Sequence, residues 1–156
     1  MALQDLYREV ILDHYKNPRN RGHLAKVDAS AQGVNPLCGD EINIELEFDD
    51  HDTVVDVAIE GQGCSISQAS ASMMTDAIKG KKKSEIEEIV SKFRAMMSLD
   101  EGAELELDPE RPGAVLGDIE SLQGVRQYPV RIKCASLGWT VLTEALKGGT
   151  DQTISI

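Results

Sequence analysis

Three cysteines and a nearby aspartate are the residues of this chain whose types and spacing suit metal or sulfur chemistry. Cys38, Cys64 and Cys134 lie 26 and 70 residues apart in a chain of 156 residues. Structural zinc knuckles place two cysteines within a few residues of each other, and no two cysteines are that close here. If all three bind one metal ion, the fold must bring them together, so the scaffold forms largely without the metal and the ion is exchangeable. The odd cysteine count also excludes a complete disulfide framework.

The loop around Cys38 and the helix expected after Cys64 both favour reactive thiolates. Gly39 can adopt conformations that other residues resist, so Cys38 and Asp40 on either side of it can aim at one point. Asp40 would then add a hard oxygen ligand to the soft sulfurs and complete four ligands. Cys64 stands just before a predicted helix over 66–79, whose positive N-terminal end favours a thiolate.

Arg131 lies three residues before Cys134 and therefore shares one face of a predicted last helix with it. There it can hold Asp40 or steady a thiolate. The alternative for each cysteine is an inert core position, since free cysteine is among the most buried residue types. No histidine neighbours a cysteine in sequence, and we expect packing or surface roles for all three: His14, His23 and His51.

Hydrophobic periodicity predicts the elements that must position these side chains. Apolar residues at three-four spacing indicate helices, which we place at 3–15, 66–79, 84–97 and from Pro129 to a stop at Gly148. Alternating apolar and polar residues indicate strands, which we place at 42–48 and 55–59 as an antiparallel hairpin, with a short strand near 25–29. We also expect a helical turn over 117–123 and a capping box formed by Ser84 and Glu87.

The charge balance excludes several classes of partner. The chain has 16 basic and 27 acidic residues and a formal net charge of −11, whereas nucleic-acid binding requires a basic face. No apolar run approaches the roughly 20 residues of a membrane span, and the N-terminal segment 1–10 is too polar for a signal peptide. We therefore expect a cytoplasmic protein with neither nucleic acid nor membrane as partner. Residues 98–123 carry −7 of the charge and are a candidate partner-facing surface, with a solvated loop as the default interpretation.

Four sequence motifs follow one another along the chain. They are Leu6-Tyr7-Arg8 with Asp13-His14-Tyr15-Lys16-Asn17-Pro18-Arg19-Asn20, then Asn35-Pro36-Leu37-Cys38-Gly39-Asp40, then Gly61-Gln62-Gly63-Cys64-Ser65-Ile66-Ser67, and last Arg131-Ile132-Lys133-Cys134-Ala135. With these motifs in this order, residues 3–147 resemble the NifU N-terminal, IscU and SufU family of iron–sulfur cluster assembly proteins.

Three features resemble the SufU branch of that family rather than the IscU branch. Lys133 stands where the IscU branch has a histidine before its third cysteine. About twenty extra residues, roughly 98–123, separate the third helix from the last. The chaperone-recognition motif of the IscU branch is replaced by Tyr128-Pro129-Val130-Arg131-Ile132, so the sequence does not predict dependence on a dedicated Hsp70.

The resemblance implies a single compact α+β domain of the SufE/NifU-like type over residues 1–148. A small antiparallel β-sheet packed by helices would form it, with the acidic insertion at about 98–123 and a flexible tail at 149–156. It also implies one tetrahedral Zn²⁺ ion, bound by Cys38, Asp40, Cys64 and Cys134. The supporting positions around that ion would be Gly39, Arg131 and Lys133.

The implied partner is a PLP-dependent cysteine desulfurase of the SufS type, with downstream iron–sulfur assembly proteins beyond it. Cys38 would accept the persulfide sulfur, which makes the protein a zinc-dependent sulfurtransferase or desulfurase activator rather than a stand-alone enzyme. A closed four-ligand site has no open position, so Cys38 must leave the metal to react, and we expect a desulfurase histidine to replace it. If the acidic stretch faces the desulfurase, neutralising four of its carboxylates weakens binding in a salt-dependent way: Asp100, Glu101, Glu104 and Glu106.

Three alternatives remain at this stage. The same four ligands would suit a scaffold that assembles and transfers a [2Fe–2S] cluster, although Lys133 removes the imidazole of the IscU branch. A zinc-stabilised interaction module without sulfur chemistry would use the same ligand types. A stand-alone cysteine hydrolase is the weakest alternative, because no motif places a histidine near a cysteine.

Overall fold

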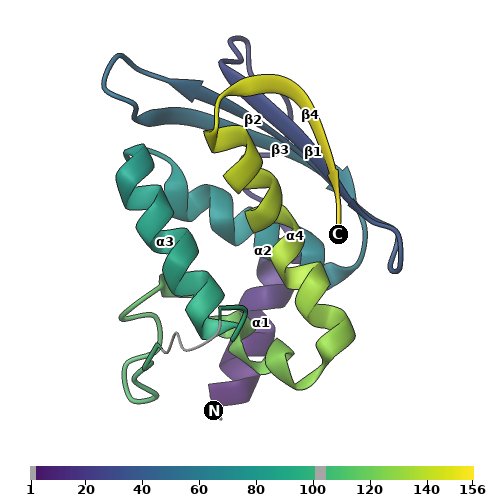
Figure 1. Ribbon diagram of the computed structural model, residues 1–156. Helices are drawn as coiled ribbons and strands as arrows, with labels where there is room; N and C mark the ends of the chain where they lie inside the picture. Colours follow the sequence, from purple (N-terminus) through teal and green to yellow (C-terminus); the bar gives the residue numbers. More distant parts are fainter. Residues whose placement is uncertain (1–2, 101–104) are drawn as a thin grey trace.

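The computed structural model describes residues 3–100 and 105–156 and has one four-stranded sheet with helices on one face (Figure 1). Helices α2 and α4 pack against the sheet, and α1, α3 and the 3-10 helix η1 pack on them. No helix in these two ranges is long and apolar enough to cross a membrane. The predicted α+β fold is confirmed. Its elements are α1 (Leu3–Lys16), β1 (Ala29–Asn35), β2 (Asp40–Phe48), β3 (Val54–Gln62), α2 (Ser65–Ile78), α3 (Lys83–Met96), η1 (Gly117–Gln127), α4 (Pro129–Leu146) and β4 (Gly149–Ser155).

The strands follow the order β3-β2-β1-β4. Strands β2 and β3 are antiparallel, with Ile44 opposite Ile59 and both buried, so the predicted hairpin is confirmed. Strand β1 runs later than the predicted 25–29, because Ala29 and the alternate residues after it enter the core. It pairs antiparallel with β2, and the short turn between these two strands carries one of the cysteines.

The C-terminal segment corrects one prediction. We expected a flexible tail at 149–156, but Gly149–Ser155 forms β4, which runs parallel to β1 and makes the sheet mixed. Ile154 packs on the core, and the Ile156 backbone N–H donates to the Val34 carbonyl at 3.0 Å. Periodicity misses such a strand, because a short segment at the sheet edge needs few apolar residues to hold it.

The helical layer is centred on Trp139 of α4, which is 2% exposed. Its ring stacks on Phe93 of α3, with 4.3 Å between centroids and 11° between planes. Its indole N–H donates to the Ser70 hydroxyl of α2 at 3.0 Å, so one side chain joins three helices. A hydrogen-bond partner offsets the desolvation of a buried indole N–H, and this contact holds α4 against α2.

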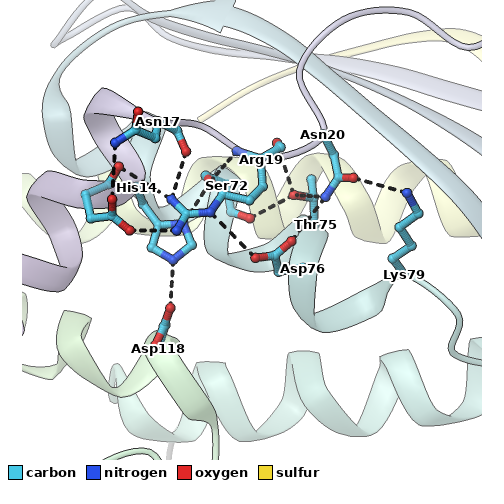
Figure 2. Close-up of polar contacts among 10 residues, drawn as sticks. His14, Asn17, Arg19, Asn20, Ser72, Thr75, Asp76, Lys79 and Asp118 are labelled. Carbon is cyan, nitrogen blue, oxygen red and sulfur yellow. Dashed lines mark hydrogen bonds and ion pairs between the residues drawn. The ribbon is translucent and has the colours of Figure 1, made fainter.

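The first sequence motif clamps α1 to its neighbours (Figure 2). His14 is 1% exposed; its Nδ1 lies 2.8 Å from the Ser72 hydroxyl in α2, and its Nε2 lies 2.9 Å from a carboxylate oxygen of Asp118 in η1. The Arg19 backbone N–H donates to the same hydroxyl at 2.9 Å. The packing role predicted for His14 is confirmed, since it ties α1 to two segments that are distant in sequence.

The acidic stretch 98–123 is folded onto the core where the structure describes it. Glu120 is 1% exposed and accepts the backbone N–H groups of Gly113, Val115 and Leu116 at 2.8–3.1 Å. Three such bonds satisfy a buried carboxylate. Apolar side chains attach the stretch to the core: Leu99, Leu105, Leu107, Leu116, Ile119 and Leu122.

Some acidic side chains of this stretch are committed to contacts within the chain. Asp100 pairs with Arg94 of α3 at 2.9 Å, and Glu120 is buried. Glu101 and Glu104, two of the four carboxylates in the predicted desulfurase-facing set, lie outside the described residues. The partner-facing role of that set stays a prediction.

The N-cap of α3 and the extent of η1 differ from the predictions. The Glu85 carboxylate accepts the Lys82 backbone N–H at 3.0 Å, at the start of a helix whose first residue is Lys83. The predicted box of Ser84 and Glu87 is therefore wrong, because the N-cap of α3 is Lys82 rather than Ser84, which puts Glu85 at the third helical position. The predicted turn over 117–123 is the first part of the longer helix η1.

Candidate metal centre

The β1–β2 turn and α4 bring three of the predicted ligands together. One ligand atom each from Cys38, Asp40 and Cys134 lies within 4.8 Å of the others. Asp40 is the first residue of β2, opposite Asn35 at the end of β1, and Cys38 stands in the turn between them. Cys134 and Asp40 are 0% and 1% exposed, whereas Cys38 is partly exposed. The centre is thus buried on one side and open at Cys38.

The Asp40 carboxylate is held by hydrogen bonds from the start of α2. Its Oδ1 accepts the Cys64 backbone N–H at 2.9 Å and the Ser67 hydroxyl at 3.2 Å. A carboxylate at a helix N-terminus is stabilised by the free N–H groups and by the helix dipole. Its Oδ2 lies 3.4 Å from the Asn35 amide nitrogen, so both oxygens are positioned by the protein.

Two glycines allow the loops to approach so closely. Gly63 has φ +149°, and a Cβ there would overlap the Asp40 Oδ1 atom and lie 2.8 Å from the Ser67 hydroxyl oxygen. Only a residue without a side chain fits between these two groups. Gly39 has φ +70° with nothing within 4 Å of a built Cβ, so its left-handed backbone, not crowding, is what favours glycine in the turn.

Cys64 lies beside the group of three rather than inside it. It is the N-cap of α2 and is partly exposed, and its thiol contacts Cys134 and Arg131. Four ligands about 2.3 Å from a tetrahedral zinc ion lie about 3.8 Å from one another. A four-ligand site therefore requires the Cys64 side chain to turn toward the other three.

The environment of Cys134 is unfavourable for an unpaired thiolate. Burial raises the pKa of the Cys134 thiol, and hydrogen bonds with Asp40, Cys38 and Cys64 raise it further. A nearby divalent cation reverses this preference, because its charge stabilises the deprotonated sulfur. Two buried ligand atoms, one sulfur and one oxygen, converge here within 4.8 Å of each other, as a metal site requires.

The supporting residues predicted from sequence separate into two kinds. Arg131 of α4 lies beside Cys134 and Cys64, and its interaction with these two groups raises the pKa of its guanidinium, hydrogen bonding to Cys134 most of all. Its guanidinium therefore lies beside the two sulfurs, and its predicted role, to hold Asp40 or to steady a thiolate, stays a prediction. Lys133 is exposed on the same helix.

A groove of about 430 Å³ adjoins the centre. It runs between α1, η1 and the first turns of α2 and α4, and its lining includes Tyr7, Ile66, Tyr128 and Arg131. Tyr128 is 61% exposed and Leu37, in the β1–β2 turn, is 71% exposed. Apolar side chains exposed to this extent beside a reactive group are typical of a protein-docking surface.

A serine–histidine–aspartate line exists in the structure but does not form a hydrolase site. Ser72, His14 and Asp118 are linked by the two hydrogen bonds of the α1 clamp (Figure 2). Ser72 is 0% exposed and its hydroxyl also accepts the Arg19 N–H, so no substrate can reach it. His14 contacts this serine rather than a cysteine, which leaves the hydrolase alternative without support.

Sequence reasoning missed three residues that shape the centre. Asn35, Gly63 and Ser67 all contact Asp40 or crowd it. Each of them lies inside one of the two sequence motifs, 35–40 and 61–67, that contain Cys38 and Cys64. The signal that was available is their position one to three residues from a predicted ligand, but their contacts depend on β1, β2 and α2 meeting at one end of the sheet.

Comparisons with known proteins agree with this geometry. A family model described as the NifU-like N terminal domain matches residues 6–135. The chain is 48% identical over 147 residues to the zinc-dependent sulfurtransferase SufU of Bacillus subtilis, covering 92% of this chain and 91% of that protein. It is 43% identical over 158 residues to the iron–sulfur cluster assembly scaffold protein IscU of Streptococcus pyogenes, covering 97% and 93%.

Solved structures give the same result. An iron–sulfur cluster assembly scaffold protein for the SUF system from Fervidobacterium islandicum matches with a TM-score of 0.76 and 38% identity, over 88% of this chain and 94% of that chain. The residues matched by the family model run from α1 into α4 and contain all four predicted ligands. The chain therefore belongs to the family of proteins that contain the NifU-like N terminal domain.

Proposed function

We propose that this protein serves iron–sulfur cluster assembly as a zinc-binding sulfur acceptor for a PLP-dependent cysteine desulfurase. The observation that carries the proposal is the convergence of partly exposed Cys38 with buried Asp40 and Cys134. The name of the Bacillus subtilis relative, a zinc-dependent sulfurtransferase, supports it. The proposed place of action is the cytoplasm, and downstream iron–sulfur assembly proteins are the proposed receivers of the sulfur.

The donor set suits zinc. Thiolates with one carboxylate match the ligands and the tetrahedral geometry that zinc prefers. Bound zinc would supply the charge that keeps the thiolates deprotonated at neutral pH. The proposed ligands are Cys38, Asp40, Cys64 and Cys134, with Gly39, Arg131 and Lys133 in supporting positions.

Cys38 is the proposed acceptor, because it is the ligand best able to move. It is partly exposed and lies in a turn beside Gly39, whereas Cys134 is buried within α4. In the proposed step, the Cys38 thiolate attacks the outer sulfur of the desulfurase persulfide. A new S–S bond forms on Cys38, the old S–S bond breaks, and the desulfurase cysteine leaves as a thiolate, so no external oxidant or reductant is needed.

The surface around Cys38 suits a protein partner. Leu37, Tyr128 and Val130 are 71%, 61% and 55% exposed, and they lie in the β1–β2 turn and at the start of α4. Arg131 and Lys133 add positive charge at this rim, although the whole chain carries −11. We propose that the desulfurase docks here, with apolar contacts supported by carboxylates on its own surface.

Sulfur transfer from a desulfurase tests the proposal. Wild-type protein and the Cys38→Ala variant are incubated with desulfurase, PLP and labelled cysteine, and the persulfide-bearing peptide is identified by mass spectrometry. We expect the label on the Cys38 peptide of the wild type and none on the variant. Undiminished labelling of Cys38→Ala, or a persulfide on the Cys64 or Cys134 peptide, overturns the assignment of the acceptor.

A [2Fe–2S] scaffold is the second candidate function, and the similarity to proteins named IscU scaffold favours it. The same four residues would then bind the cluster, since thiolates and carboxylates also bind iron. Anaerobic reconstitution with iron and sulfide discriminates between the two. A stable cluster that moves intact to an apo-acceptor supports the scaffold, whereas zinc retention with no visible absorption supports sulfur transfer.

A further inference from the structure

Asn35, the last residue of β1, has an unusual hydrogen-bond balance beside the centre. The residue is 0% exposed. Its amide nitrogen lies 3.4 Å from Asp40 Oδ2 and 3.8 Å from the Cys134 sulfur. Its amide oxygen is buried and has no hydrogen-bond partner among the described residues. The amide NH₂ group therefore lies within hydrogen-bond distance of two predicted metal ligands. The amide oxygen has no hydrogen-bond partner among the described residues.

The orientation of the amide follows from the chemistry of its neighbours. A carboxylate and a thiolate are both acceptors, so the NH₂ group must face them; the flipped amide would direct its oxygen at two acceptors. A buried acceptor without a donor destabilises a fold. An apolar side chain of the same size would avoid that cost but would leave the Asp40 Oδ2 atom without this donor, so what asparagine contributes here is its NH₂ group.

The backbone of Asn35 does not need this side chain either. The Asn35 carbonyl accepts the Cys38 backbone N–H at 3.2 Å, and its register with Asp40 belongs to the β1–β2 ladder. Any residue can make these contacts. What asparagine adds is one donor group that reaches an oxygen ligand from β2 and a sulfur ligand from α4 at the same time.

We propose that Asn35 is a positioning residue of the metal centre, whose amide NH₂ group orients Asp40 and Cys134 toward one ion. The inference rests on the metal centre of the proposed function. Hydrogen bonds from outside the coordination sphere orient ligands, and their removal typically lowers metal affinity by about 10- to 100-fold. A bond to sulfur also changes the electron density that the sulfur donates to the metal.

The test uses Asn35→Leu, which keeps the size of the side chain and removes both the donor and the orphaned oxygen. The full chain is titrated with Zn²⁺ against a chromogenic chelator, and with Co²⁺, whose visible spectrum reports ligand geometry. Chemical denaturation is measured in chelator. Asn43→Leu is the matched control, because Asn43 lies in the adjacent strand β2 and is only partly buried.

We expect Asn35→Leu to bind Zn²⁺ about 10- to 100-fold more weakly than wild type and to shift the Co²⁺ bands. Denaturation in chelator should show that the variant still folds cooperatively, so that the weaker binding and the shifted Co²⁺ bands are measured on a folded protein. Wild-type affinity and an unchanged Co²⁺ spectrum in Asn35→Leu overturn the inference alone. Failure of the wild-type protein itself to bind either metal overturns the proposed centre and the inference with it.

Discussion

Gly63 offers the sharpest test of how the centre is assembled. An added Cβ at this position would overlap Asp40 Oδ1 and lie 2.8 Å from the Ser67 hydroxyl oxygen and 3.0 Å from the Asp40 Cα. In Gly63→Ala the carboxylate must therefore turn away from the two groups that donate to it, the Ser67 hydroxyl and the Cys64 N–H. The substitution acts on a ligand without removing it.

Two separate costs follow from this substitution. The first is backbone strain, about 1–3 kcal/mol, because φ +149° is a conformation that alanine rarely adopts. The second is the displaced carboxylate: a hydrogen bond to a charged group is worth about 1.5–3 kcal/mol. At 1.4 kcal/mol per tenfold, the second cost corresponds to roughly 10- to 150-fold weaker zinc binding.

Gly22→Ala is the control that separates these costs. Gly22 also has a positive φ, +130°, but nothing lies within 4 Å of a Cβ built there, so only the strain remains. Denaturation in chelator should show a loss of about 1–3 kcal/mol in Gly22→Ala and a larger loss in Gly63→Ala, which also breaks hydrogen bonds to the Asp40 carboxylate. Chelator competition should show weaker zinc binding in Gly63→Ala only. Equal zinc affinity in the two variants would refute the reasoning that Gly63 positions Asp40.

Three further predictions concern the scaffold. His14→Gln should lose about 2–4 kcal/mol of unfolding free energy, since the buried hydrogen bond to Ser72 and the partly buried one to Asp118 are broken. The exposed control His51→Gln should stay within about 0.5 kcal/mol, and equal urea midpoints would contradict this. Glu120→Ala should free residues 113–116 and speed their amide exchange; unchanged exchange would count against it. Two glutamates raise the pKa of His23, so its stabilisation is present below about pH 6.5 and disappears as pH rises through the raised value. The wild type should therefore gain urea resistance over His23→Gln at pH 5.5 and not at pH 8.5, and a constant difference would refute this.

The helices and the central hairpin could be predicted because their signals are local. Apolar residues at helical spacing place α1 and α2, and strict alternation marks the buried face of β2, whereas β3 buries Val54 and then three residues in succession from Val57. Strand β4 could not be predicted in this way, because its pairing with β1 is parallel and depends on α4 carrying the chain back along the sheet. The cap of α3 was misplaced because Glu85 and Glu87 both offer a carboxylate, and only the path of the chain selects one.

The sequence alone determined which residues could do the chemistry: three cysteines and Asp40, in loops and at a helix start, with an acid-rich chain around them. Tertiary structure decided which of them meet. The register of β1 and β2 sets Asn35 opposite Asp40, and the packing of α4 on the sheet delivers Cys134 to the same point. The roles of the buried ligand atoms and of Gly63 depend on that meeting point. Burial, hydrogen bonding and steric overlap are set by neighbours in space, which the linear spacing of 26 and 70 residues does not reveal.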